Sequence, residues 1–328
     1  MNRRTTIYLL LFFILGWLAS SIFSTSSNDR EIYPVRENSV KSRYTNPLIF
    51  IDNSNTEYEK LNPLKEKVEE YIDTTVSNRK AERTSFYFRD LDSSQWTGVN
   101  PDDRFVPASI LKVATLMVYL RKVEENPEIT NQKLLYKKNQ MEKQLYPPSA
   151  ELEEGYYGVG RLLGQAVVES DNAAALALYK NVSGEYSELY KTLRLPPQPV
   201  DPANFMSPRE VSRIFRALYG STYLLNTYSE QALELLTRTN FDKGITNGLD
   251  PNIEVAHKFG EYAVYYPDDI DSPDYQLHDC GIVYYPERPY FICVMTEGKN
   301  LKNLEEVIST ISQITHTFVN EGDYITIR

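Results

Sequence analysis

Ser109 and Lys112 are the first residues whose types and spacing could do chemistry. They form a Ser-x-x-Lys pattern that opens a long apolar run ending at Leu120. Residues three apart on a helix share a face, so the hydroxyl and the amine can come within hydrogen-bond reach. A lysine that has lost its proton can take the proton of the serine and make it a nucleophile. Pro107 favours a helix start here, and burial of that start would lower the pKa of the lysine.

The spacing alone does not identify a site, because the same pattern recurs at Ser77 and Lys80 in a polar, charged stretch. Context distinguishes the two copies, since only the Ser109 copy lies in an apolar environment. Two further motifs follow Ser109 in the chain, Ser170-Asp171-Asn172 and Lys258-Phe259-Gly260.

The elements that must position these residues are strands near both ends of the domain and a helical block between them. Residues 61–76 and 301–318 have the period of amphipathic helices, and residues 109–226 are mostly helical in period. Strands are predicted at 84–90, 94–99, 255–261, 281–285 and 290–295. The fold class is therefore α/β, of the α+β kind: an antiparallel five-stranded sheet flanked by helices, with an inserted all-helical subdomain. A cleft between the two parts is the expected place for a site.

The N-terminus carries an export signal. Two arginines, Arg3 and Arg4, precede an uncharged run from Thr5 to Phe23, which is just long enough to span a bilayer. The arginines predict a cytoplasmic N-terminus with the rest of the chain outside. A signal peptide cleaved near Ala19 is the alternative, and both predict an exported body. We favour a retained single-pass anchor in the cell membrane over a secreted protein.

We expect two parts along the chain, an N-terminal segment and a folded domain that is itself divided. Residues 1–46 are expected to form the anchor or signal and a polar stalk, and residues 47–328 the folded domain. Within that domain we expect a sheet part at 47–106 and 232–328, and a helical part at 107–231.

Composition excludes several classes of function. The net charge is −10 and no basic stripe is visible, which excludes nucleic-acid binding. The three histidines and two cysteines show no metal-ligand spacing, so no metal and no other cofactor are expected. We expect a monomer whose partner is a small molecule.

Cys280 and Cys293 leave a choice of register. If Tyr285 pairs with Tyr290, the two cysteines become diagonal neighbours, beyond easy reach of a disulfide. If Tyr284 pairs with Pro289 instead, a shift of two residues, they lie directly opposite each other. We favour two buried free thiols.

Taken together, the three motifs resemble those of the penicillin-recognising serine hydrolases, and among them the class A β-lactamases, which carry Ser-x-x-Lys, Ser-Asp-Asn and Lys-Thr-Gly in this order. The resemblance covers roughly residues 84 to 320 and implies a β-lactamase/transpeptidase-like fold. It extends to the segments around the motifs, at 102–108, 157–163, 204–208 and 278–284.

The resemblance implies a role for each motif residue. Ser109 would be the nucleophile and Lys112 its base. Ser170 would relay a proton to the leaving nitrogen, and Lys258 would tune that relay. The substrate would be bound by Asn172, Gly260 and Glu261, with the backbone N–H groups of Ser109 and Glu261 as an oxyanion hole. Asp171 and His257 are interpreted as structural.

The sequence departs from the family in two places. No glutamate lies between Thr192 and Ser207, where the family carries the residue that activates the deacylating water, and Leu176 replaces an asparagine that helps to hold that loop. Phe259 replaces the motif threonine and cannot donate a hydrogen bond to a substrate carboxylate.

We therefore expect an exported, membrane-anchored serine hydrolase of class A β-lactamase-like type. A β-lactam or a related peptidoglycan-derived amide would acylate Ser109, and deacylation would be slow. A D-alanyl-D-alanine peptidase-like protein is the enzymatic alternative. The non-enzymatic alternative is a non-catalytic domain of the same fold that binds peptidoglycan or a protein.

Overall fold

The computed structural model describes residues 42–46, 57–138, 144–182, 184–196, 205–266, 269–286 and 288–322. The predicted membrane span, Thr5–Phe23, lies outside these ranges. Among the residues described, no helix is long and apolar enough to cross a bilayer.

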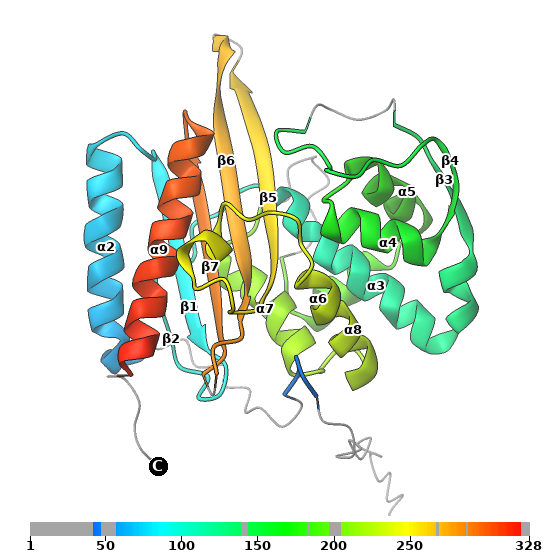
Figure 1. Ribbon diagram of the computed structural model, residues 1–328, viewed down its shortest axis with the longest axis horizontal. Helices are drawn as coiled ribbons and strands as arrows, with labels where there is room; N and C mark the ends of the chain where they lie inside the picture. The colour runs from blue at the N-terminus through cyan, green and yellow to red at the C-terminus, as the bar shows by residue number, and fades with distance from the viewer. Residues whose placement is uncertain are drawn as a thin grey trace, which may run out of the picture. The chain divides into compact units, whose positions relative to one another are not determined.

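Five strands form one antiparallel sheet in the order β2-β1-β7-β6-β5, which confirms the predicted architecture. Figure 1 shows β5 at the edge nearest the inserted helices. The strands are β1 (Arg83–Asp90), β2 (Trp96–Val99), β5 (Val255–Tyr266), β6 (Asp269–Val283) and β7 (Tyr290–Gly298).

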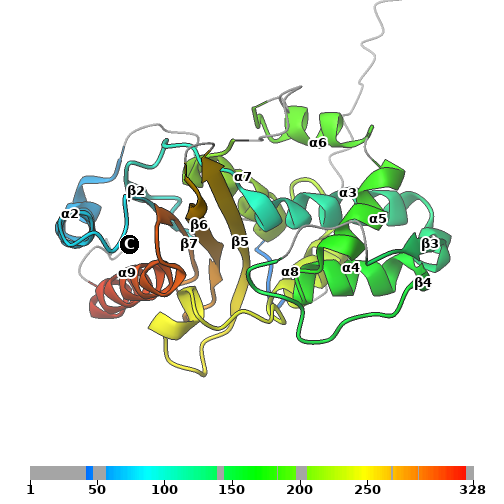
Figure 2. The same cartoon turned by 90° about the horizontal axis from the view of Figure 1, so that it is seen from above.

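Helices cover both faces of this sheet, and each face has its own hydrophobic core. On one face, α2 (Asn62–Ser77) and α9 (Leu301–Glu321) lie side by side, as Figures 1 and 2 show. Their apolar side chains, such as Leu64 and Ile308, pack against strand residues such as Phe86. Burial of such side chains is the main favourable term in folding.

The other face packs against the inserted part. The helices of that part are α3 (Leu111–Glu125), α4 (Val159–Val168), α5 (Asn172–Val182), α6 (Tyr186–Thr192), α7 (Pro208–Tyr219) and α8 (Asn226–Leu236). Ser207 caps α7, with Glu210 reciprocating as the sequence predicts. Short 3₁₀ turns connect several elements: η1 (Glu59–Leu61), η2 (Ala108–Ile110), η3 (Pro127–Asn131) and η4 (Ile245–Gly248).

Two features differ from the sequence prediction. The inserted part contains a two-stranded sheet, β3 (Lys133–Tyr136) with β4 (Gly155–Gly158), which the helical period did not indicate. The strands β5 and β6 also extend past the predicted ends at Glu261 and Gly281 into a long hairpin. Residues 262–266 are a continuous apolar and aromatic run and residues 269–274 are mostly polar, so neither arm shows the alternation by which strands are recognised.

The prediction of two free thiols is wrong. Val283 pairs with Tyr290, so Cys280 lies directly opposite Cys293 and the two form a disulfide. The register that the sequence analysis disfavoured is the one adopted, and it brings the Cα atoms within 4.0 Å.

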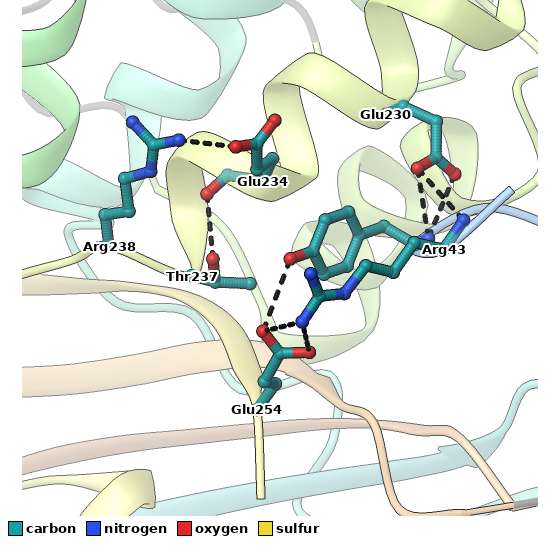
Figure 3. A network of polar contacts seen from close by, with 7 residues as sticks. Arg43, Glu230, Glu234, Thr237, Arg238 and Glu254 are labelled. Carbon is teal, nitrogen blue, oxygen red and sulfur yellow. Dashed lines mark hydrogen bonds and ion pairs between the residues drawn. The ribbon is translucent and has the colours of Figure 1, made fainter.

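Residues 42–46, here called the N-terminal strap, are bound to α8 and to the approach to β5. The carboxylate of Glu230 accepts hydrogen bonds from the backbone N–H groups of Arg43, Tyr44 and Thr45, at 3.1, 2.9 and 2.6 Å. The Arg43 guanidinium donates to both carboxylate oxygens of Glu254, at 2.8 Å each (Figure 3). One acid thus holds three consecutive backbone donors, which fixes the path of the chain entering the domain.

Candidate active site

Ser109 lies in the turn η2, which leads directly into α3, where Lys112 occupies the first helical turn. Both side chains are buried. The Lys112 amine lies 2.8 Å from Ser109 Oγ, so the predicted pair is in hydrogen-bond contact. The preceding residue, Ala108, has a positive φ of 48°, a strained conformation for a non-glycine residue. Such strain is concentrated at functional sites, where the surrounding structure enforces it.

Ser170 lies in the turn between α4 and α5 and also has a positive φ, of 55°. The Lys112 amine donates to its carbonyl oxygen at 2.5 Å and lies 3.2 Å from its hydroxyl. The same amine donates to Asn172 Oδ1 at 2.6 Å. Lys112 thus connects the Ser-x-x-Lys motif to the Ser-Asp-Asn motif.

Lys258 comes from the edge strand β5, and its amine donates to Ser170 Oγ at 2.8 Å. Gly260, two residues on, explains how the strand approaches so closely. A Cβ atom at this position would lie 2.5 Å from the carbonyl oxygen of Pro107, just before Ser109. Only glycine fits this contact, which places the unpaired edge of β5 beside the nucleophile.

The electrostatics favour an uncharged amine beside Ser109. Burial lowers the pKa of Lys112 to about 7, although Asp171 and Glu261 partly oppose this. Burial also lowers the pKa of Lys258 well below its ordinary value, and the charge of Lys112 adds to the effect. At neutral pH a neutral amine is therefore available to accept a proton.

Gln144 holds the two ends of the Ser-Asp-Asn turn, a contact that the sequence analysis did not predict. Its Nε2 donates to the Ser170 carbonyl oxygen at 3.1 Å, and its Oε1 accepts from the Asn172 N–H at 3.1 Å. No sequence motif identifies Gln144, because it lies in a loop 26 residues before Ser170 and reaches it only through the fold.

A cavity of about 680 Å³ opens over these residues, the size of a small-molecule site. Ser109, Lys112 and Asn172 line it, together with Leu176 and Glu261. The predicted contribution of Glu261 was its backbone N–H, but its side chain also lies here. The Glu261 Oε2 accepts a hydrogen bond of 2.8 Å from the N–H of Tyr146.

Phe259 does not line the cavity. Its ring stacks on Phe241 with centroids 4.2 Å apart, and Tyr146 packs edge-on against both rings. Tyr146 does not line the cavity either, whereas its neighbours Leu145 and Gln144 do. The position of the family threonine is therefore filled by a hydrophobic contact, and no hydroxyl is offered there.

Asp171 and His257 make structural contacts, as the sequence suggested. The Asp171 carboxylate accepts from the N–H of Ala174 at 3.0 Å and from the hydroxyl of Tyr136 at 2.9 Å. The ring of His257 lies 2.9 Å from Asp279. Residues 197–204 of the glutamate-free loop lie outside the described residues.

The sequence-predicted residues Ser109, Lys112, Ser170, Asn172 and Lys258 therefore meet in one hydrogen-bonded cluster. A serine beside a neutral buried amine, with a second hydroxyl and a second amine adjoining, is suited to acyl transfer.

Solved structures of similar fold belong to one group of proteins. A mutant of PBP-A in an acyl-enzyme complex with penicillin G is 18% identical, with a TM-score of 0.67 over 80% of this chain and 97% of that chain. A beta-lactamase from Chitinophaga pinensis is 18% identical, with a TM-score of 0.67 over 77% of this chain and 100% of that chain. A class A beta-lactamase from Bacteroides cellulosilyticus is 19% identical, with a TM-score of 0.66 over 79% and 99%. The fold is thus the class A β-lactamase-like fold of serine hydrolases.

The family itself is shown by sequence. The model of the beta-lactamase enzyme family matches residues 64–321, so the chain belongs to that family. No curated relative matches the sequence.

Proposed function

We propose that this protein is an exported, membrane-anchored serine hydrolase that is acylated at Ser109 by a β-lactam or a related cell-wall amide and releases the acyl group slowly. The contact that carries the proposal is the 2.8 Å hydrogen bond between Lys112 Nζ and Ser109 Oγ, made by an amine whose pKa burial lowers to about 7.

The acylation step begins when the neutral Lys112 amine takes the proton of the Ser109 hydroxyl. The serine oxygen then bonds to the amide carbonyl carbon, and the backbone N–H groups of Ser109 and Glu261 would stabilise the oxyanion. When the carbon–nitrogen bond breaks, a proton passes through the Ser170 hydroxyl to the leaving nitrogen. The contacts of the Ser170 hydroxyl with both Lys112 and Lys258 support this relay. The products are an ester on Ser109 and an amine, which departs from a linear amide but stays attached to the acyl group when a β-lactam ring opens.

Slow deacylation follows from what the sequence lacks. Hydrolysis of the ester needs a positioned water and a base. The segment between Thr192 and Ser207 contains no glutamate to serve as that base. Leu176 supports the same conclusion, because an apolar side chain lines the cavity where the family has an asparagine.

Export and anchoring rest on the segment Thr5–Phe23 and the arginines before it. The Cys280–Cys293 disulfide supports an oxidising compartment.

A D-alanyl-D-alanine peptidase-like activity is the second candidate, and the missing loop glutamate favours it. The third candidate, a non-catalytic binding domain, is favoured only by Phe259.

The test is labelling of the purified protein with a fluorescent penicillin, followed by denaturing gel and by absorbance of the released product. We expect a persistent Ser109 adduct, little hydrolysis, and no label on Ser109→Ala. Rapid turnover would show that a deacylating group is present and would reject the slow step. Hydrolysis of a D-alanyl-D-alanine peptide would select the second candidate.

A further inference from the structure

Glu261 lines the cavity, and its carboxylate lies close enough to Lys112 and Lys258 to interact with both. Glu261 belongs to β5, whereas its hydrogen-bond partners Tyr146 and Gln144 belong to the loop between β3 and β4. Gln144 in turn holds Ser170 and Asn172. A negative group of the protein is thus fixed beside the residues that would bind a substrate.

The cavity has no surplus of positive charge to attract an anion. Within the ranges that the structure describes, its lining includes one cation, Lys112, and one carboxylate, Glu261. Burial raises the pKa of the Glu261 carboxyl above its ordinary value, while Lys112 and Lys258 favour its charged form. Because burial lowers the pKa of both lysines, the carboxylate offsets what positive charge they keep at neutral pH.

The neighbouring position, 259, also lacks a hydroxyl that could bind a carboxylate. Phe259 stacks on Phe241 and offers no donor. An anionic group entering this part of the cavity would therefore meet Glu261 without a compensating hydroxyl, and like charges placed together strongly disfavour binding.

We propose that Glu261 determines substrate specificity by slowing acylation by donors that carry a carboxylate next to the scissile amide. The preferred donor then has a neutral or cationic leaving part, such as an amide within a peptide chain or an amidated terminus. A repulsive group selects among substrates as effectively as an attractive one does. This inference rests on the proposed acylation of Ser109.

The experiment compares two probes that differ only in this charge: benzylpenicillin, which has a free carboxylate, and its methyl ester. The second-order rate of Ser109 acylation is measured for each by intact-protein mass spectrometry. We expect the full-length protein to react with the ester about tenfold faster or more. In Glu261→Gln the ratio of the ester rate to the free-acid rate should fall by most of that factor.

Two further variants separate charge from loop positioning. Glu261→Asp keeps the charge and should keep the preference for the ester. Glu305→Gln is the matched control, because Glu305 accepts a hydrogen bond of 2.6 Å from the Tyr146 hydroxyl and does not line the cavity. It should leave the ratio of the two rates unchanged.

The inference is overturned if the wild-type protein reacts with the free acid as fast as with the ester, or if Glu261→Gln leaves the ratio unchanged. A fluorophosphonate, which reacts with activated serines, distinguishes failure of the inference from failure of the proposed function. If it labels Ser109 and the charge preference is absent, only the inference fails. If folded protein reacts with none of the three probes, the proposed function fails too.

Discussion

Lys258 Nζ lies 2.8 Å from Ser170 Oγ, and this contact joins the edge strand to the inserted helical part. Lys112 approaches the same hydroxyl from the other side, at 3.2 Å. A single buried hydroxyl therefore connects two amines, each with a lowered pKa. The arrangement is a short path along which a proton can move from the nucleophile to a leaving nitrogen.

Replacing Lys258 with methionine should slow acylation by about a hundredfold, because the relay through Ser170 loses its second amine. Methionine has a similar volume and can fill the buried position. The measurement is the rate of Ser109 labelling by benzylpenicillin methyl ester. Lys243→Met is the control, since the side chain of Lys243 is about half exposed. Equal effects of the two changes would contradict the relay.

The acylation rate should rise with pH and level off above about pH 7, where Lys112 becomes neutral. The same shift has a consequence for stability. Between about 7 and 10.5 the unfolded chain holds a proton on this lysine that the folded chain has lost, so its contribution to the free energy of unfolding rises with pH in that window. A pH profile of labelling, measured beside urea unfolding, tests both. A rate that stays flat through neutral pH would contradict the role of Lys112 as base.

The motif residues could be predicted from the sequence because Ser109, Lys112, Ser170 and Lys258 carry a recognisable order along the chain. Sheet architecture was also predictable, since strand and helix patterns differ in period. Contacts that depend on the register between two strands could not be predicted from the sequence. A shift of two residues decides whether Cys280 meets Cys293, and the pattern of buried residues permits either register because such a shift keeps each side chain on its own face.

Contacts made by loops were also beyond prediction. Gln144 and the side chain of Glu261 reach the site from segments 117 residues apart, and neither residue type is distinctive in its local sequence. Only the fold brings them together, so a sequence reading assigns Glu261 a backbone role alone.

Phe259→Thr should destabilise the fold by about 3 kcal/mol, because it leaves a void against Phe241 and buries a hydroxyl. Urea denaturation measures the change in the free energy of unfolding. Tyr262→Ala, a substitution of a residue that is 39% exposed on the same strand, should cost less than about 1 kcal/mol. A neutral effect of Phe259→Thr would show that the aromatic cluster does not hold this position.

Glu230→Ala should release the N-terminal strap, because three backbone N–H groups lose their common acceptor, at a cost of about 1–3 kcal/mol. Limited proteolysis near residues 42–46 should become faster. Glu234→Ala removes the exposed pair with Arg238 (Figure 3) and a minor electrostatic interaction with Arg43 but keeps every contact of Glu230, so it should leave the cleavage rate unchanged. If both variants resist proteolysis as the wild type does, the strap is held by other contacts.

The most direct test of the central claim is to identify the acylated residue and the lifetime of its adduct. Wild-type protein is incubated with benzylpenicillin and with its methyl ester, and intact-mass spectra and peptide maps are recorded over several hours. The account predicts one added acyl group, located on Ser109, that persists after excess reagent is removed. Absence of any adduct on folded protein, or an adduct that forms equally on Ser109→Ala, would contradict it.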